Sequence, residues 1–271
     1  MVITVQYANP SDTSALLESI DALDDSTTCH VIVVDNSPDR PLDAKPAEKP
    51  YRMPVDVLVS PQNLYYWGGA AFAIDTIRRD AGKLPPWVII CNNDTTIDQA
   101  DFLKRLADLD PAAFPIIAPA VTSLASRRDQ NPMLEKPPAY LQRLKWSIYD
   151  LAYPVARAML AAHKALSPKN LKGNSDSRTR RRIYAPHGAF VILSSAFFAR
   201  GGDLDTHVAM FAEELTLAET ARALGLPVWY LPELRVTHAE HSTTGSGLTR
   251  EKYALERMAR RRYYDLRRSI P

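Results

Sequence analysis

The sequence has little cysteine: Cys29 and Cys91 are the only two among 271 residues, and each falls in an apolar, strand-like stretch. Two cysteines so far apart exclude a disulfide scaffold and a cysteine-rich zinc site, and they predict small buried hydrophobic residues in a reducing compartment. A charge imbalance is also lacking, since 33 Lys and Arg nearly balance 31 Asp and Glu. The net charge therefore gives no argument for a nucleic-acid partner.

Long hydrophobic runs are absent as well. No window approaches the roughly 20 apolar residues that span a bilayer, and the start MVITVQYANP lacks the basic segment and long apolar run of a signal peptide. We therefore expect a cytoplasmic protein whose membrane contact is at most peripheral. Hydrophobic residues make up 46% and charged residues 24%, which is typical of a globular protein and excludes global disorder.

Apolar, strand-like segments alternate with helical patterns through the first 120 residues. Strands of a parallel sheet buried on both faces are continuous apolar runs, as in CHVIVVDNS and PWVIICNND. The expected strands are 2–8, 29–37, 55–60 and 86–94, and the expected helical stretches are 9–23, 67–80 and 98–109. Ser11 or Asp12 is the expected N-cap of the first helix. This alternation predicts an α/β fold with a Rossmann-like, doubly wound, mostly parallel sheet.

The remaining chain divides into three regions. Residues 121–182 carry prolines, an amphipathic helix broken at Pro154 and a basic loop, which predicts a helical and loop insertion. Residues 183–246 return to the α/β pattern, with strands at 188–195, 227–232 and 234–241 and a helix at 212–224 closed by Gly225. Residues 247–271 form an Arg-rich helix. We interpret 1–120 and 183–246 as halves of one domain.

Amide and acidic side chains follow three predicted strands: Asp35 and Asn36 after the second, Asn63 after the third, and Asn92 to Asp94 after the fourth. Asn and Asp favour turns, because they bond their own backbone and tolerate left-handed conformations. Open α/β sheets, however, bind ligands at the carboxyl ends of their strands. Neighbouring strands converge on one crevice, so the set favours a ligand site, and carboxylate oxygens there suit Mg²⁺ or Mn²⁺.

The stretch NLYYWGGAAF has glycines at the start of a predicted helix. It lacks both the P-loop and the dinucleotide-binding glycine motifs, so the residues alone indicate a close turn into a helix at Gly68 and Gly69. Its aromatic residues either stack on a base or sugar or belong to the core, and the pattern does not separate the two.

Two further groups are candidates for chemistry. Glu213 and Glu214 begin a predicted helix, where acids complement the helix dipole, but a carboxylate among apolar neighbours can also serve as a general base. His238 and His241 follow a predicted strand. Each is either an ordinary surface histidine or a metal ligand, and His238 could complete a site begun by Asp94.

Taken in order, the motifs VDNSPD, NLYYWGGA, ICNND, GAFVILSS, FAEEL and PELRVTHAEHS resemble those of glycosyltransferase family 2. Within that family the sequence is similar to bacterial rhamnosyltransferase-like and galactofuranosyltransferase-like enzymes with a GT-A fold. The similarity covers nearly the whole chain apart from residues 123–182. It assigns nucleotide-sugar binding to residues 1–120, and acceptor binding and catalysis to residues 183–246.

The resemblance also implies roles by position. It makes Glu214 the catalytic base and makes Asp94 and His238 the metal ligands. The sequence departs from the family pattern at Asn92, which replaces an acid of the metal motif, at Glu214, which replaces an aspartate, and at Thr216, which replaces another acid. The implied contacts with the donor are made by Asn9, Asp35, Asn36, Asn63, Trp67, Gly68, Asn93 and Asp94.

The implied reaction is an inverting hexosyl transfer that depends on Mn²⁺ or Mg²⁺. The donor would be a UDP- or dTDP-linked sugar, and the acceptor a hydroxyl of a cell-surface polysaccharide or a polyprenyl-linked glycan. One alternative is a sugar-nucleotide nucleotidyltransferase, although YANPSDTS offers no glycine-rich, Arg-containing loop after the first strand. Another is an inactive nucleotide-sugar-binding module. The Arg-rich helix either lies on an anionic membrane surface or packs on the body of the protein or in a homodimer.

Overall fold

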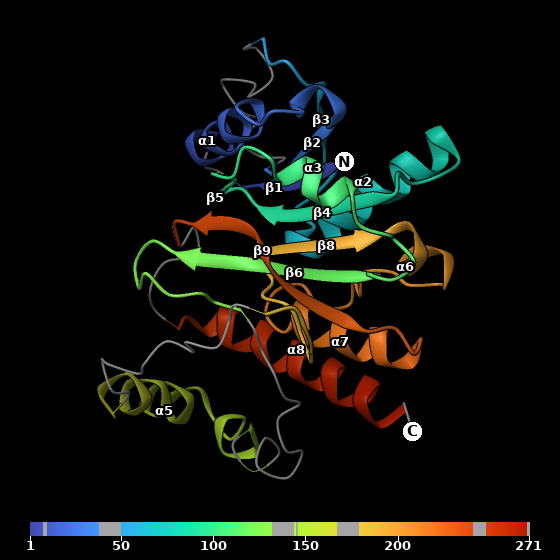
Figure 1. The fold of residues 1–271 in the computed structure, drawn as a ribbon. Helices are drawn as coiled ribbons and strands as arrows, with labels where there is room; N and C mark the ends of the chain where they lie inside the picture. The colour runs from blue at the N-terminus through green and yellow to red at the C-terminus, as the bar shows by residue number, and fades with distance from the viewer. Residues whose placement is uncertain are drawn as a thin grey trace.

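A computed structural model describes residues 1–7, 10–37, 50–131, 144, 146–166, 179–240 and 248–269, without the side chains of 163–166. Within these residues, nine strands form one sheet that is flanked by helices (Figure 1). The strands are β1 (Val2–Gln6), β2 (Val31–Asp35), β3 (Val55–Val59), β4 (Trp87–Asn92), β5 (Thr95–Thr96), β6 (Ile116–Ser123), β7 (Arg181–Ile183), β8 (Phe190–Ser194) and β9 (Val228–His238). The helices are α1 (Pro10–Asp21), η1 (Ser26–Thr28), α2 (Tyr65–Ala81), α3 (Phe102–Ala107), α5 (Tyr153–Leu166), α6 (Ser195–Ala199), α7 (Glu213–Ala223) and α8 (Arg250–Ser269).

The sheet runs in the order β3-β2-β1-β4-β8-β6-β9-β5, and β7 pairs with β9. Strands β3, β2, β1 and β4 are parallel, which confirms the α/β class expected for the first half of the chain. Strand β8 runs antiparallel to β4 and β6, whereas β6 and β9 are parallel. As a result, the loop that enters β8 lies beside the carboxyl end of β4.

Four strands differ from expectation: the short strands β5 and β7 were not predicted, and β6 and β9, which each contain a proline, also differ. Strand β6 was not predicted, and it crosses the expected boundary at residue 120. Strand β9 was predicted as two strands and is one. The pairing of β6 with β9 passes from Leu231 directly to Arg235 where Pro119 meets Ala120, so the segment with Pro232 forms a bulge. Proline interrupts the local strand pattern, while the bulge lets the strand continue.

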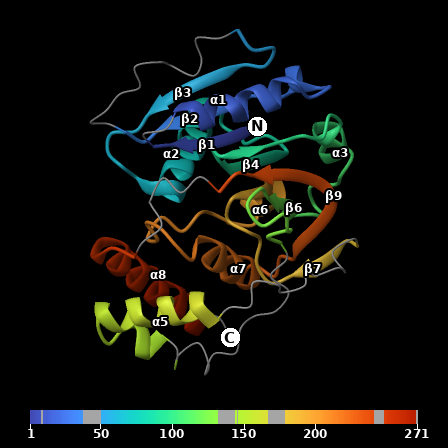
Figure 2. The same cartoon turned by 90° about the vertical axis from the view of Figure 1, so that its left-hand side faces the viewer.

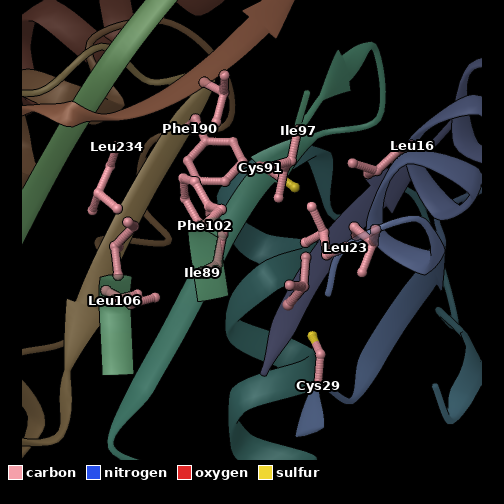
Figure 3. Close-up of a cluster of buried hydrophobic side chains, with 14 of the residues drawn as sticks. Leu16, Leu23, Cys29, Ile89, Cys91, Ile97, Phe102, Leu106, Phe190 and Leu234 are labelled. Atoms are coloured by element: carbon pink, nitrogen blue, oxygen red, sulfur yellow. The ribbon is translucent and has the colours of Figure 1, made fainter. Parts of the chain in front are cut away.

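Helices cover both faces of the sheet. Helices α1 and α3 pack on one face, where the rings of Phe102 and Phe190 make an edge-to-face contact at 5.9 Å (Figure 3). Helices α2, α6 and α7 pack on the other face through Trp67, Phe197 and Leu217. Both cysteines are buried and unpaired, as predicted.

The starts of two helices follow from local chemistry. Helix α1 begins at Pro10, so Ser11 and Asp12 lie in its first turn, and the expected N-cap at either residue was wrong. Proline suits a first helical position because it has no N–H to satisfy. Gly69 lies where α2 crosses β1, and a Cβ atom there would come within 3.0 Å of both methyl groups of Val5. Helix α2 already begins at Tyr65, so both glycines lie inside it and the expected turn at Gly68 and Gly69 is wrong; Gly69 instead permits the close packing of α2 on β1.

Helix α5, in the described part of the insertion, lies at the end of the molecule opposite β3 (Figure 1). Helix α8 packs beside α7, and α5 packs beside α8 (Figure 2). Pro154 stands second in α5, after an irregular step at 150–152, so the predicted break is confirmed. Helix α8 buries Tyr253, Ala259 and Tyr263. No helix among the described residues combines the length and apolar character needed to cross a membrane.

Candidate active site

A cavity of about 830 Å³ lies at the carboxyl ends of β1 and β4. Its other walls are the turn before α2, the loop before β8, the first turn of α7, the end of β9 and the first turn of α8. The residues that the sequence had singled out and that line this cavity are Asn36, Asn63, Asn92, Asn93, Asp94, Glu213, Glu214 and His238. Residues from both halves of the chain therefore share one space.

Asp94 and His238 form a close pair in this cavity. Oδ1 of Asp94 lies 3.2 Å from Nε2 of His238, and the two side chains are only 8% and 10% exposed. The pair is positioned by the sheet, because β5 pairs with β9 so that Thr95 lies opposite His238. The N–H of Ala239 also donates a hydrogen bond of 2.9 Å to the carbonyl of Asp94.

The orientation of the His238 ring suits a cation. Oε1 of Gln130 lies 2.7 Å from Nδ1, which donates to it, and in the neutral ring Nε2 then presents its lone pair toward Asp94. An imidazole nitrogen and a carboxylate oxygen are suitable ligands for Mn²⁺, so the two residues fit a divalent cation. Among the residues that the structure describes, no three His, Cys, Asp or Glu side chains gather as a metal site. Water or substrate phosphate would have to supply further ligands.

Glu213 and Glu214 both line the cavity and are half-buried. Burial raises the pKa of Glu214. Burial and then the charge of Glu214 raise the pKa of Glu213 to about 8, although its own N–H and that of Phe211 partly oppose the shift. Carboxyl groups with raised pKa values in a cavity are candidates for general acid–base chemistry.

The backbone before these two acids is strained. Phe211 and Ala212 both have positive φ angles, of 70° and 61°, immediately before α7, and both line the cavity. A left-handed conformation costs a residue with a Cβ atom roughly 1–2 kcal/mol. Such strain is often retained at functional sites. Thr216, by contrast, is buried and donates to the carbonyl of Glu213, so it does not take the place of an acid in the cavity.

Asn36 and Asn63 organise the turn before α2. Asn36 donates to Oδ1 of Asn63 at 2.9 Å and to the carbonyl of Tyr65 at 3.1 Å, and it accepts from the N–H of Leu64 at 2.8 Å. Oδ1 of Asn63 also accepts from the N–H of Tyr65. Asn36 is 1% exposed. It therefore shapes this wall of the cavity, which the more exposed Asn63 also lines.

Other predicted donor contacts are placed differently. The side chain of Trp67 is 1% exposed and packs in the core, so the expected contact between this side chain and the donor is wrong for this structure. Gly68 lies within α2, and the buried Asp35 accepts from the N–H of Ser37; neither lines the cavity. Asn93 lines it and donates to Thr13. The predictions for Asn9 and His241 lie outside the described residues.

Several cavity residues were not singled out from the sequence. Tyr7, His187, Glu240 and Lys252 all line it. Burial and then His238 lower the pKa of His187 to about 4, and its Nδ1 accepts from the N–H of Ala189. Its position in PHGAF, directly before a buried strand, was the available signal. Nothing local distinguishes the other three residues.

No protein-family model matches the sequence, and no curated protein matches it. Solved structures do match the fold: GalNAc-T7 with UDP, GalNAc and Mn²⁺ aligns over 93% of this chain, with a TM-score of 0.58 and 13% identity. S. aureus TarS 1–349 in complex with UDP-GlcNAc aligns over 95%, with a TM-score of 0.58 and 15% identity. Mannosyltransferase PcManGT from Pyrobaculum calidifontis with GDP-Man and Mn²⁺ aligns over 97%, with a TM-score of 0.54 and 16% identity.

The alignments cover 46%, 64% and 69% of those three chains respectively, so this chain spans about half of GalNAc-T7. Identities this low show similarity of fold alone. The mixed sheet with helices on both faces is nonetheless the arrangement that these glycosyltransferases share. The expected GT-A fold is confirmed.

Proposed function

We propose that this chain is an inverting, metal-dependent glycosyltransferase of the hexosyl type, which uses a nucleoside diphosphate sugar as donor. The observation that carries the proposal is that a candidate general base and two candidate cation ligands lie in one cavity. A carboxylate with a raised pKa, Glu214, and a pair of cation ligands, Asp94 and His238, line the same space. Sugar transfer needs a base at the acceptor and a neutralising group at the departing diphosphate.

In the proposed reaction, Glu214 takes the proton from an acceptor hydroxyl. That oxygen attacks the anomeric carbon, a new glycosidic bond forms, and the bond from the anomeric carbon to the diphosphate oxygen breaks. The nucleoside diphosphate leaves with the electron pair, and a single displacement inverts the anomeric configuration. A cation held by Asp94 and His238 would supply Lewis-acid assistance to the leaving group. General-base assistance contributes typically about 10²–10⁴-fold.

The fold neighbours support this donor class. GalNAc-T7 was crystallised with UDP, GalNAc and Mn²⁺, and PcManGT was crystallised with GDP-Man and Mn²⁺. TarS was crystallised with UDP-GlcNAc. For this chain we propose a UDP- or dTDP-linked donor and Mn²⁺ or Mg²⁺. The donor would lie between the Asn36–Asn63 turn and the Asp94–His238 pair, and the proposed subtype is rhamnosyltransferase-like or galactofuranosyltransferase-like.

The acceptor we propose is a cell-surface polysaccharide or a polyprenyl-linked glycan at an anionic membrane on its cytoplasmic side. Three residues at helical spacing support this assignment, because Leu144, Ile148 and Leu151 are 63%, 40% and 75% exposed. The guanidinium groups of Arg157 and Arg250 lie over the ring of Tyr153. The Tyr153 hydroxyl bonds the carbonyl of residue 248, next to the cavity wall. Flotation with anionic vesicles tests the assignment, and protein that stays at the bottom would contradict it.

The deciding experiment is a panel of nucleotide sugars incubated with and without glycan acceptors. We expect release of a nucleoside diphosphate that depends on acceptor and cation. Release of pyrophosphate from a nucleoside triphosphate and a sugar phosphate would instead identify a nucleotidyltransferase. Donor binding without any release, over the whole panel, would identify a binding module. Light scattering would test separately whether the chain forms a homodimer.

A further inference from the structure

A chain of directional hydrogen bonds runs behind His238, away from Asp94. Glu240 accepts from the hydroxyl of Ser123 at 2.8 Å and from Nε2 of Gln130 at 2.5 Å. Oε1 of the same Gln130 lies 2.7 Å from Nδ1 of His238. Nε2 of His238 then lies 3.2 Å from Oδ1 of Asp94.

The directions of these bonds are determined by Glu240. The amide nitrogen of Gln130 donates to Glu240, so only its carbonyl oxygen is left to face His238. The carbonyl oxygen of Gln130 therefore points toward His238 and requires a proton on Nδ1. In the neutral ring this leaves a lone pair on Nε2, facing an oxygen of Asp94. Two such acceptors repel one another unless a cation or a proton lies between them.

Without Gln130, the opposite tautomer would be favoured. A proton on Nε2 would bond Asp94 directly, and the two side chains would satisfy each other in place of a cation. Glu240 also adopts a left-handed backbone conformation, with φ of 60°. A residue with a Cβ atom tolerates that strain where the surrounding structure maintains it, often at a functional site. Glu240 itself lines the cavity.

We propose that Gln130 and Glu240 are positioning residues that hold His238 in the Nδ1–H tautomer, so that Nε2 and Asp94 bind a divalent cation. The inference rests on the cation of the proposed function. Partners behind a metal-bound histidine usually change metal affinity about 10–100-fold when they are removed. Neither Gln130 nor Glu240 needs to touch the cation.

The test measures Mn²⁺ binding by the full chain without any donor, through the electron paramagnetic resonance signal of free Mn²⁺. We expect Gln130→Leu and Glu240→Gln to bind Mn²⁺ about 10–100-fold more weakly than the wild type. The double variant Gln130→Glu/Glu240→Gln reverses the donor and acceptor between these two positions. It still offers an acceptor to Nδ1, so we expect affinity within a few-fold of the wild type. Thermal unfolding checks that each variant is folded.

Two results of the binding test with these variants would overturn the inference. One is unchanged Mn²⁺ affinity in both folded single variants, and the other is a folded double variant that binds as weakly as they do. Nitrogen-15 NMR of the wild type reports the tautomer of His238 directly, without metal and without a variant that has to fold. An Nε2–H tautomer in that experiment would also overturn the inference. If the wild type transfers sugar but binds no Mn²⁺, the proposed role of the cation and this inference are both rejected. The proposed transferase activity is not.

Discussion

Gly188 lies directly against Glu214: a Cβ atom added to Gly188 would be 3.6 Å from Oε2 of that carboxylate. The hydroxyl of Tyr66 donates to the carbonyl of the same glycine at 3.1 Å. The loop before β8 therefore joins the start of α2 to the start of α7. This contact places the proposed base on a wall that three separate segments support.

Replacement of this base should remove catalysis but not binding. We expect Glu214→Gln to lower kcat by about 10²-fold or more, because a glutamine cannot take the acceptor proton. Nucleotide affinity should stay near the wild-type value, since shape and hydrogen-bonding capacity are nearly retained. Steady-state kinetics and calorimetric titration with the nucleoside diphosphate measure the two quantities.

The matched control is Glu233→Gln. Glu233 lies on β9 outside the cavity lining and pairs with Arg180. Exposed ion pairs contribute only about 0–1 kcal/mol, so this variant should keep full activity. Full activity of Glu214→Gln would remove Glu214 from the mechanism.

As the pH is lowered, activity should be lost at a higher pH than it would be if the base were a glutamate with an ordinary pKa. The base must be ionised to act, and the pKa of Glu214 is raised. The acid limb of kcat/KM should therefore lie above pH 4.5. With a pKa of about 8, Glu213 is still protonated and neutral while Glu214 titrates, so Glu213→Gln should leave that limb where it is in the wild type. An acid limb that moves to lower pH in Glu213→Gln would show that Glu213 is charged in that range and would contradict its raised pKa.

Glu213→Gln should also stabilise the protein at alkaline pH. The pKa of Glu213 is about 8 in the folded chain, against an ordinary value of 4.5. The folded state thus binds the proton more tightly than the unfolded state, and stability is lost as pH rises from 4.5 through 8. Glutamine carries no charge, so its advantage in Tm should be present at pH 9 and absent near pH 4. A Tm difference independent of pH would contradict this explanation.

Removal of the cation should stop turnover. We expect EDTA to abolish activity and Mn²⁺ or Mg²⁺ to restore it. Asp94→Asn should lower kcat/KM by about 100-fold or more, because cation assistance at a leaving group is worth several kcal/mol. High Mn²⁺ should recover part of this loss. Activity that is indifferent to the chelator would reject the metal role of Asp94 and His238.

Loss of Asn36 should weaken donor binding through the turn that it organises. Asn36→Ala leaves the N–H of Leu64 without its acceptor and removes one donor from Oδ1 of Asn63, which should cost about 1–3 kcal/mol of folding stability. The nucleotide Kd should rise, since Asn63 in that turn lines the cavity. Asn36→Asp keeps the acceptor for Leu64 and should lose less stability. An unchanged Kd in folded Asn36→Ala would exclude this turn from the donor site.

Much of the fold could be predicted from local patterns. Apolar runs identified β1, β2 and β4, and Pro154 marked the break before α5. Gly225 closes α7 with φ of 66°, and the N–H of Leu226 bonds the carbonyl of Ala221. These features depend on residues a few positions apart. Strand β6 was not predicted, because its pairing with β9, including the bulge, joins residues that are distant in sequence.

The candidate site was predictable only in part. Local patterns identified Asn63, Asp94 and Glu214, because polar groups after strands and acids at a helix start are visible in the sequence. They could not separate Trp67 from its neighbours, since an aromatic residue packs in a core or faces a ligand depending on which way its helix is turned. The structure buries Trp67 and leaves Tyr65 and Tyr66 on the cavity.

The sequence by itself determined where chain segments form strands and helices, and which chemical groups follow them, because periodicity, caps and turn preferences act over a few residues. Tertiary structure alone decided that Asp94 meets His238 and that Gln130 and Glu240 lie behind it. Those contacts depend on β5 and β6 pairing with β9 in one register, and a shift of one residue would turn each side chain to the opposite face.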